Sequence, residues 1–244
     1  MNEAEWNACN DPRTMLDVVR GKATERKLRL FAVACCRRIW PLLTDERSRT
    51  ALIVAERFAE GEATDDELEG ALALAWRVYR DLEEARVTSQ LAGDGQESEE
   101  CRATREAAQA VGWVTHQGDP GLPPDEGVGR LRRVFPVIAA AAGHAYLAMS
   151  RLERPAHKAG QVGFLRDIFG SALRSVTFDP GWRTHHVVAL ATTIYQDYSF
   201  DRTAELADAL EEAGCTDADI LSHCRAPGPH VRGCWLVDLL LDKA

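Results

Sequence analysis

Near the end of the chain, five cysteine and histidine residues fall within twenty positions. They are Cys215, His223, Cys224, His230 and Cys234. Thiolate and imidazole groups are the donors that zinc prefers, and four of them commonly surround the ion as a tetrahedron. Here the gaps are irregular, with no Cys-x-x-Cys pair, so the pattern allows a zinc site without requiring one. Cys224 and Cys234 also fall on apolar stripes, where a free cysteine packs as a small hydrophobic residue. Both interpretations stay open.

The same stretch supports a second hypothesis, in which it binds an anion or a partner's carboxylate. Pro229 suits the first turn of a helix, and the free N–H groups and dipole of a helix start attract negative charge. Arg225, His230 and Arg232 flank this predicted start. Alternatively, Arg225 and Arg232 pair with Asp217, Asp219 or Asp238 and tie the three helices together, which is the commoner use of such charges.

The rest of the chain carries no recognisable catalytic motif. It lacks the Gly-x-Ser-x-Gly elbow, the phosphate loop, His-Glu-x-x-His and the dinucleotide fingerprint. Cys35 and Cys36 lie beside arginines that would favour a thiolate, but both occupy positions that helix packing requires. We therefore expect a non-enzymatic protein that acts by interaction or as a scaffold. A zinc-binding protein or metal-dependent enzyme, using the C-terminal Cys/His cluster, is the alternative.

Charge is distributed unevenly along the chain. The net charge is −9 and the isoelectric point is about 5.3, which argues against binding to nucleic acid or to anionic membranes. Residues 26–49 nevertheless contain seven basic and two acidic residues. These charges suit ordinary solvated helix faces. A sharper hypothesis is a basic patch containing Arg26, Arg29 and Arg37 that docks an acidic protein partner.

Positioning any of these residues requires helices. Nearly every segment has helical spacing of its apolar residues, and no run alternates with the period of two typical of a half-buried strand. The sequence predicts an all-α fold of about ten to twelve helices with little or no sheet. Residues with N-cap chemistry mark many of the starts. They are Asp11, Thr24, Thr44, Thr64, Ser98, Thr184 and Thr216.

The final stretch, residues 203–241, reads as three short helices. Gly214 ends the first, Thr216 caps the second, and the third begins at Pro229. The third helix is apolar nearly all round, which predicts burial of residues such as Trp235 and Leu239. We therefore expect the chain to end in its own core.

One stretch rich in glycine and proline, residues 118–129, interrupts the helical pattern. This predicts an N-terminal unit over residues 1–117, a linker or long loop over 118–129 and a C-terminal unit over 130–244. No stretch is apolar enough to cross a bilayer, and the N-terminus does not look like a signal peptide. Seven cysteines, an odd number, suit a reducing cytoplasm better than a disulfide framework.

Two parts of the chain resemble a family of uncharacterised planctomycete proteins. One is the region from Arg20-Gly21-Lys22-Ala23 to Cys35-Cys36-Arg37-Arg38-Ile39-Trp40. The other comprises residues 206–215 and the run Pro227-Gly228-Pro229-His230-Val231-Arg232-Gly233-Cys234-Trp235. The resemblance implies a helical protein anchored at both ends. It implies no activity, cofactor or catalytic residue.

Overall fold

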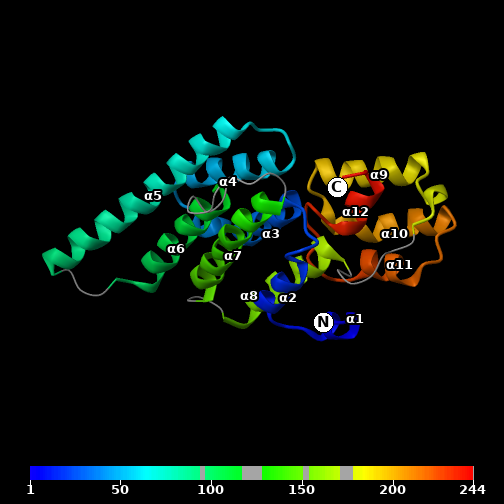
Figure 1. Cartoon of the computed structure of the whole chain (residues 1–244), viewed down its shortest axis with the longest axis horizontal. Helices are drawn as coiled ribbons and strands as arrows, with labels where there is room; N and C mark the ends of the chain where they lie inside the picture. The colour runs from blue at the N-terminus through cyan, green and yellow to red at the C-terminus, as the bar shows by residue number, and fades with distance from the viewer. Residues whose placement is uncertain (94–96, 117–127, 151–153, 171–177, 244) are drawn as a thin grey trace.

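The protein is helical throughout the part of the chain that its computed structural model describes. The described residues are 1–93, 97–116, 128–150, 154–170 and 178–243. Within them lie twelve α-helices, three short 3-10 helices and no strand, which confirms the predicted all-α fold (Figure 1). The α-helices are α1 (Glu3–Ala8), α2 (Pro12–Val19), α3 (Glu25–Arg38), α4 (Glu46–Ala59), α5 (Asp65–Ala92), α6 (Glu99–Val114), α7 (Val128–Ser150), α8 (Arg154–Phe169), α9 (His185–Gln196), α10 (Thr203–Glu212), α11 (Ala218–Arg225) and α12 (Trp235–Leu240).

Helix α3 forms the centre of the larger group of helices. Its nine consecutive residues from Leu28 to Cys36 are all buried. The helix packs against α4, α6, α7 and α8, so that both its faces are covered. Eight of these nine residues are apolar, so this stretch of the helix has no polar face, and the ninth, Arg29, is buried with them.

Two clusters of buried apolar residues divide the molecule. The first runs from Trp6 to Ile168, and the second runs from Val187 to Leu240. Figure 1 shows the helices of the second cluster, α9 to α12, gathered on the right. Among the described helices, therefore, the division falls between α8 and α9.

The predicted linker at residues 118–129 lies mostly outside the described residues, which resume at Val128. The helices on its two sides, α6 and α7, pack extensively against each other. Val134 and Ile138 of α7 belong to the first cluster together with Ala107 and Val111 of α6. The described helices next to this segment thus share one core, and the boundary predicted from glycine and proline does not coincide with the division between the clusters.

A buried ionic network connects the two clusters. Arg26 on α3 donates to Asp238 on α12 at 2.7 Å and to Glu60 at 3.1 Å. The Glu60 carboxylate also accepts from Tyr195 on α9 and from Lys243. Only 1–2% of either carboxylate side chain is exposed. Buried carboxylates without partners are strongly unfavourable, so Arg26 fixes how α12 sits on α3.

Several predicted helix starts are confirmed and three need correction. The caps at Asp11, Thr24, Thr64, Ser98 and Thr184 all accept hydrogen bonds from their own first turns. The predicted caps Thr44 and Thr216 are wrong by one residue, because Asp45 and Asp217 accept those bonds instead. A carboxylate following the threonine competes successfully for the same N–H groups.

The predicted helix start at Pro229 is also wrong. Residues 229–234 form an irregular segment, and α12 begins only at Trp235. Gly233 has a φ of +89°, which no right-handed helix contains. A Cβ added at Gly233 would lie 3.1 Å from Leu30 Cδ1, so glycine also allows the close approach of this segment to α3.

The burial predicted for the last helix holds only in part. Leu236, Val237 and Leu240 are buried in the second cluster. Trp235 is only partly buried, and 36% of Leu239 is exposed. A helix of six residues covers the core with one face only, which leaves the other side toward solvent. Across the described residues, no helix combines the length and the apolar character needed to cross a bilayer.

The ionic network gives a stability prediction. Arg26→Met leaves Asp238 and Glu60 buried without their shared cation, and we expect the free energy of unfolding to fall by about 3–5 kcal/mol at pH 7. Arg20→Met is the matched control, because Arg20 is 61% exposed in its pair with Asp17, and we expect it to cost less than about 1 kcal/mol.

The pH dependence of the same variant checks the cause. Burial already raises the pKa of Asp238 above its usual range, against the effect of Arg26. Without Arg26 the Asp238 carboxylate ionises at still greater cost, a penalty that disappears as pH falls through its folded-state pKa. The deficit of Arg26→Met relative to the wild type should therefore shrink between pH 7 and about pH 5 in urea titrations. A deficit independent of pH would contradict the electrostatic explanation.

Candidate metal centre

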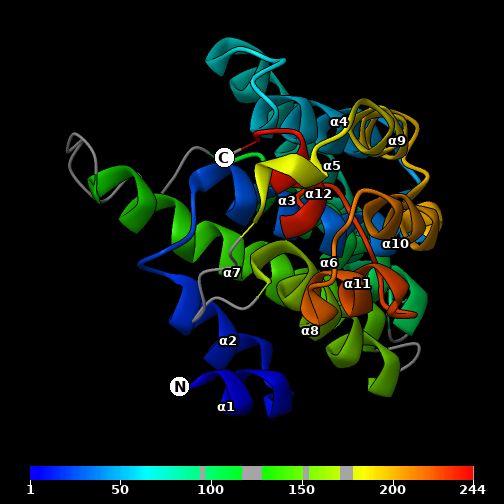
Figure 2. The same cartoon turned by 90° about the vertical axis from the view of Figure 1, so that its right-hand side faces the viewer.

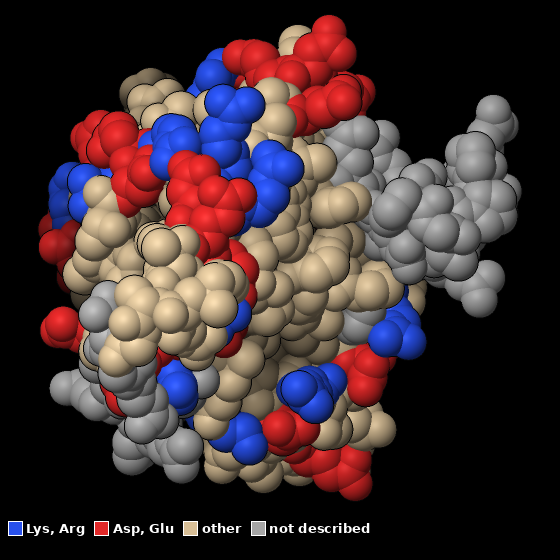
Figure 3. Space-filling view, turned by 90° about the vertical axis from the view of Figure 1, so that its left-hand side faces the viewer, with Lys and Arg blue, Asp and Glu red and all other residues tan. Residues whose placement is uncertain are grey.

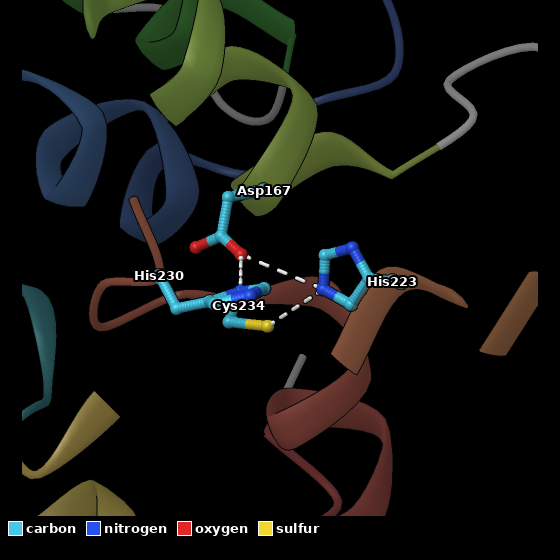
Figure 4. Close-up of side chains that lie close together, drawn as sticks. All are labelled: Asp167, His223, His230 and Cys234. Carbon is cyan, nitrogen blue, oxygen red and sulfur yellow. Dashed lines mark hydrogen bonds and ion pairs between the residues drawn. The ribbon is translucent and has the colours of Figure 1, made fainter. Parts of the chain in front are cut away.

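Four side chains from separate elements converge between the two clusters of buried residues. Asp167 comes from α8, His223 from α11, and His230 from the irregular segment between α11 and α12, while Cys234 is the N-cap of α12. Figure 4 shows all four pointing toward one another. Viewed from the end of the molecule, α11 lies beside α8, which brings His223 to Asp167 (Figure 2).

The distances between these groups are short. His230 Nδ1 lies 2.6 Å from Asp167 Oδ1, and His223 Nε2 lies 3.5 Å from the same oxygen. His223 Nε2 is also 3.2 Å from Cys234 Sγ. One donor atom from each of the four residues can be chosen so that all lie within 4.8 Å of one another. The second oxygen of Asp167 accepts from the backbone N–H of Val231 at 2.9 Å, which fixes the orientation of the carboxylate.

Burial controls the protonation of the cluster. It lowers the pKa of His223 to about 4, despite the nearby Asp167, so this imidazole is neutral at pH 7. Burial also raises the pKa of Cys234 well above its usual range, and the charge of Asp167 adds to the effect. For His230, burial lowers the pKa, but the hydrogen bond and charge of Asp167, aided by the nearby Ala226 carbonyl, raise it further than burial lowers it.

This donor set matches the preferences of zinc. Bond lengths of 2.0–2.3 Å in a tetrahedral site place ligand atoms about 3.3–3.8 Å apart, so the four donors, which lie within 4.8 Å of one another, would move by up to about 1 Å to surround an ion. Two imidazoles, one thiol and one carboxylate are all common zinc ligands. A bound dication would displace the thiol proton of Cys234 and offset the cost of burying Asp167. The residues present therefore fit a zinc ion that takes four protein ligands.

The same side chains do not form a nucleophilic triad. In such a triad the histidine uses one ring nitrogen for the nucleophile and the other for the carboxylate. Here Nε2 of His223 faces both the Cys234 thiol and Asp167. The thiol is also almost completely buried, with a raised pKa, which is opposite to the environment of a reactive cysteine.

Three of the five metal ligands predicted from sequence meet in this cluster. The other two, Cys215 and Cys224, are buried in the second apolar cluster and are not among the converging donors. Burial raises the pKa of Cys224 to about 12, as for an ordinary core thiol. The helix predicted to begin at Pro229 would have contained both His230 and Cys234. They meet instead because the chain bends through Gly233.

Sequence reasoning missed Asp167, which lies 63 positions before His230. Its only local signal is that a carboxylate stands beside buried Ile168 and close to buried Leu165 on α8. An ionisable residue among such neighbours requires a partner, but its sequence position does not say which partner.

The predicted anion or partner residues have defined positions. Arg225 pairs with Asp208 and Glu211 on α10, which is the helix-tying role considered from sequence, although with different acids. Arg232 stacks on the rings of Tyr195 and Tyr198.

The three arginines of the predicted basic patch are all engaged within the chain. Arg26 belongs to the ionic network, and Arg37 forms an ion pair with buried Glu56. Arg29 is fully buried and donates to the carbonyls of Val114 and His116 and to Glu25. Arg29 therefore cannot contribute to a basic docking patch, because the Arg29 guanidinium is buried in the core and donates to backbone carbonyls there. At the end of the molecule that lies away from α9 to α12, acidic and basic side chains are interspersed on the surface (Figure 3).

Comparison with known proteins identifies no relative. No protein family, no curated protein and no solved structure matches this chain.

The burial of Cys234 gives a prediction about thiol reactivity. In the folded protein, iodoacetamide should modify exposed Cys101 readily and should modify Cys234 only after denaturation, because the reagent needs an accessible thiolate. Peptide mass spectrometry of samples taken over time measures both sites at once. Modification of Cys234 as fast as Cys101 would show that the site is open.

Proposed function

We propose that this protein binds zinc through Asp167, His223, His230 and Cys234, and that the ion is structural. The observation that carries the proposal is the convergence of these four donors in a buried space between α8, α11 and α12. Structural zinc sites use four protein ligands, whereas catalytic ones keep a position for water or substrate. The full set of four protein donors favours the structural role.

The ion would stabilise the contact between the two clusters of buried residues. Asp167 belongs to the helix that ends the first cluster, while His223 and Cys234 belong to elements of the second. An ion that binds only the folded state adds stability according to its concentration, about 2.7 kcal/mol when free zinc exceeds the dissociation constant a hundredfold.

With a closed metal site, the chain acts by binding rather than by catalysis. A protein partner is part of this proposal, and the net charge of −9 disfavours nucleic acid as that partner. The cytoplasm is the proposed compartment, because the seven cysteines are all free, including the adjacent buried pair Cys35 and Cys36. The metal-dependent enzyme considered from sequence would instead need one of the four ligands to yield its position to substrate.

Elemental analysis tests the proposal. Protein purified without a metal-affinity tag should contain about one zinc ion per chain, and Cys234→Ala should lose most of it, since thiolate is the strongest donor of the set. Cys224→Ala is the matched control: it removes a buried thiol from the same cluster of helices and should retain zinc.

A chelator gives a second measurement on the same samples. Treatment with EDTA should lower the melting temperature of the wild type and of Cys224→Ala, but not that of Cys234→Ala. Only trace metal in the wild type, or equal zinc in both variants, would refute the assignment.

A further inference from the structure

A cleft of about 390 Å³ lies next to the candidate metal centre, between α3, α8 and the segment that follows α11. One wall is apolar and includes Leu30, Val33 and Phe164. The polar side is lined by Arg37, Arg38, Glu56, Tyr198, Asp201, His230 and Arg232. The volume is within the range of about 300–1,000 Å³ that holds small ligands. We propose that this cleft binds a small organic anion, with a carboxylate or phosphate group held by arginine and an apolar body against the opposite wall.

Arg232 is the central observation. Its guanidinium lies 3.9 Å from the centre of the Tyr198 ring and 5.1 Å from that of Tyr195. It donates to a backbone carbonyl at 3.4 Å, and its buried Nε has no hydrogen-bond partner. Among the described residues, no carboxylate lies within ion-pair distance of it. A guanidinium that is held on aromatic rings and lacks a counter-charge is suited to receive a carboxylate or phosphate in bidentate fashion.

Tyr198 lines the cleft and directly follows α9. Its φ is +55°, the left-handed value common in the residue that ends a helix, and Ser199 N–H closes the helix end by donating to the carbonyl of Ile194 at 3.1 Å. The guanidinium groups of Arg232 and Arg37 lie 3.9 Å and 5.0 Å from the centre of its ring. The tyrosine therefore ends α9 and also positions Arg232.

Arg232 is a cation of the cleft for which the described residues supply no carboxylate. Arg37 is already neutralised by Glu56. The other carboxylate that lines the cleft, Asp201, is not within ion-pair distance of Arg232. The anion would thus meet the guanidinium group of Arg232 on the side of the cleft away from the apolar wall.

The test uses four probes on the full chain: benzoate, phenyl phosphate, inorganic phosphate and neutral benzamide, each followed by isothermal titration calorimetry. We expect benzoate or phenyl phosphate to bind, benzamide not to bind, and inorganic phosphate to bind more weakly than phenyl phosphate because it lacks the apolar body. The stronger of the two ring anions identifies the charged group as carboxylate or phosphate. Binding of neither, or equal binding of benzamide, would overturn the proposal.

Variants separate the cleft from general charge effects. Arg232→Gln should raise the dissociation constant about tenfold or more, while Arg225→Gln, an exposed arginine outside the cleft, should leave it unchanged. Tyr198→Gly removes the ring and suits the left-handed backbone, so it should weaken binding without lowering the melting temperature. Equal affinity in all three variants would contradict the assignment.

The result is independent of the zinc proposal. None of Arg232, Arg225 and Tyr198 is a metal ligand, so the zinc content of each sample, measured in parallel, should stay that of the wild type. Failure of anion binding with zinc retained would refute the cleft alone.

Discussion

The carboxylate of Asp167 is the constraint on which the arrangement of the C-terminal segment depends. One of its oxygens contacts both His230 and His223, and the other accepts from the backbone of Val231. A nearly fully buried carboxylate must be satisfied, and here every partner comes from residues 223–231. The segment between α11 and α12 is therefore held where its residues can satisfy the buried carboxylate of Asp167 on α8.

Close packing restricts the same segment from its other sides. A Cβ at Gly163 would lie 2.7 Å from Pro229 Cγ, and one at Gly170 would lie 2.9 Å from the Trp235 ring. Gly163 on α8 and Gly170 directly after it thus allow the chain to pass close over this helix and its end. Together with Gly233 against Leu30, these contacts hold Cys234 where its thiol can face His223. The Arg26 network then fixes α12 from the side of α3.

The helices could be predicted from sequence because their signals are local. Caps such as Thr24 and Thr64 are readable within one window of sequence, and the structure confirms both. The errors at Thr44 and Thr216 have the same local character, since aspartate stands next to each threonine.

The site itself was only partly predictable. His223, His230 and Cys234 were recognised by residue type, and His223 does lie on a helix, α11. The helix assumed for His230 and Cys234 was wrong, because Gly233 turns the chain where that helix was expected. Asp167 could not be paired with them, since no local rule relates residues 63 positions apart. The interior role of Arg29 was equally hidden, because its acceptors are carbonyls at the end of α6 and just beyond it.

The central claim is that four named side chains form one tetrahedral metal site, and cobalt substitution tests it most directly. Co²⁺ in a tetrahedral site with a thiolate ligand gives intense visible bands and a sulfur-to-metal charge-transfer band in the near ultraviolet. Titration of metal-free protein should produce both, saturating at about one ion per chain, and addition of zinc should abolish them. The weak spectrum of six-coordinate cobalt, or a charge-transfer band that persists in Cys234→Ala, would contradict the account.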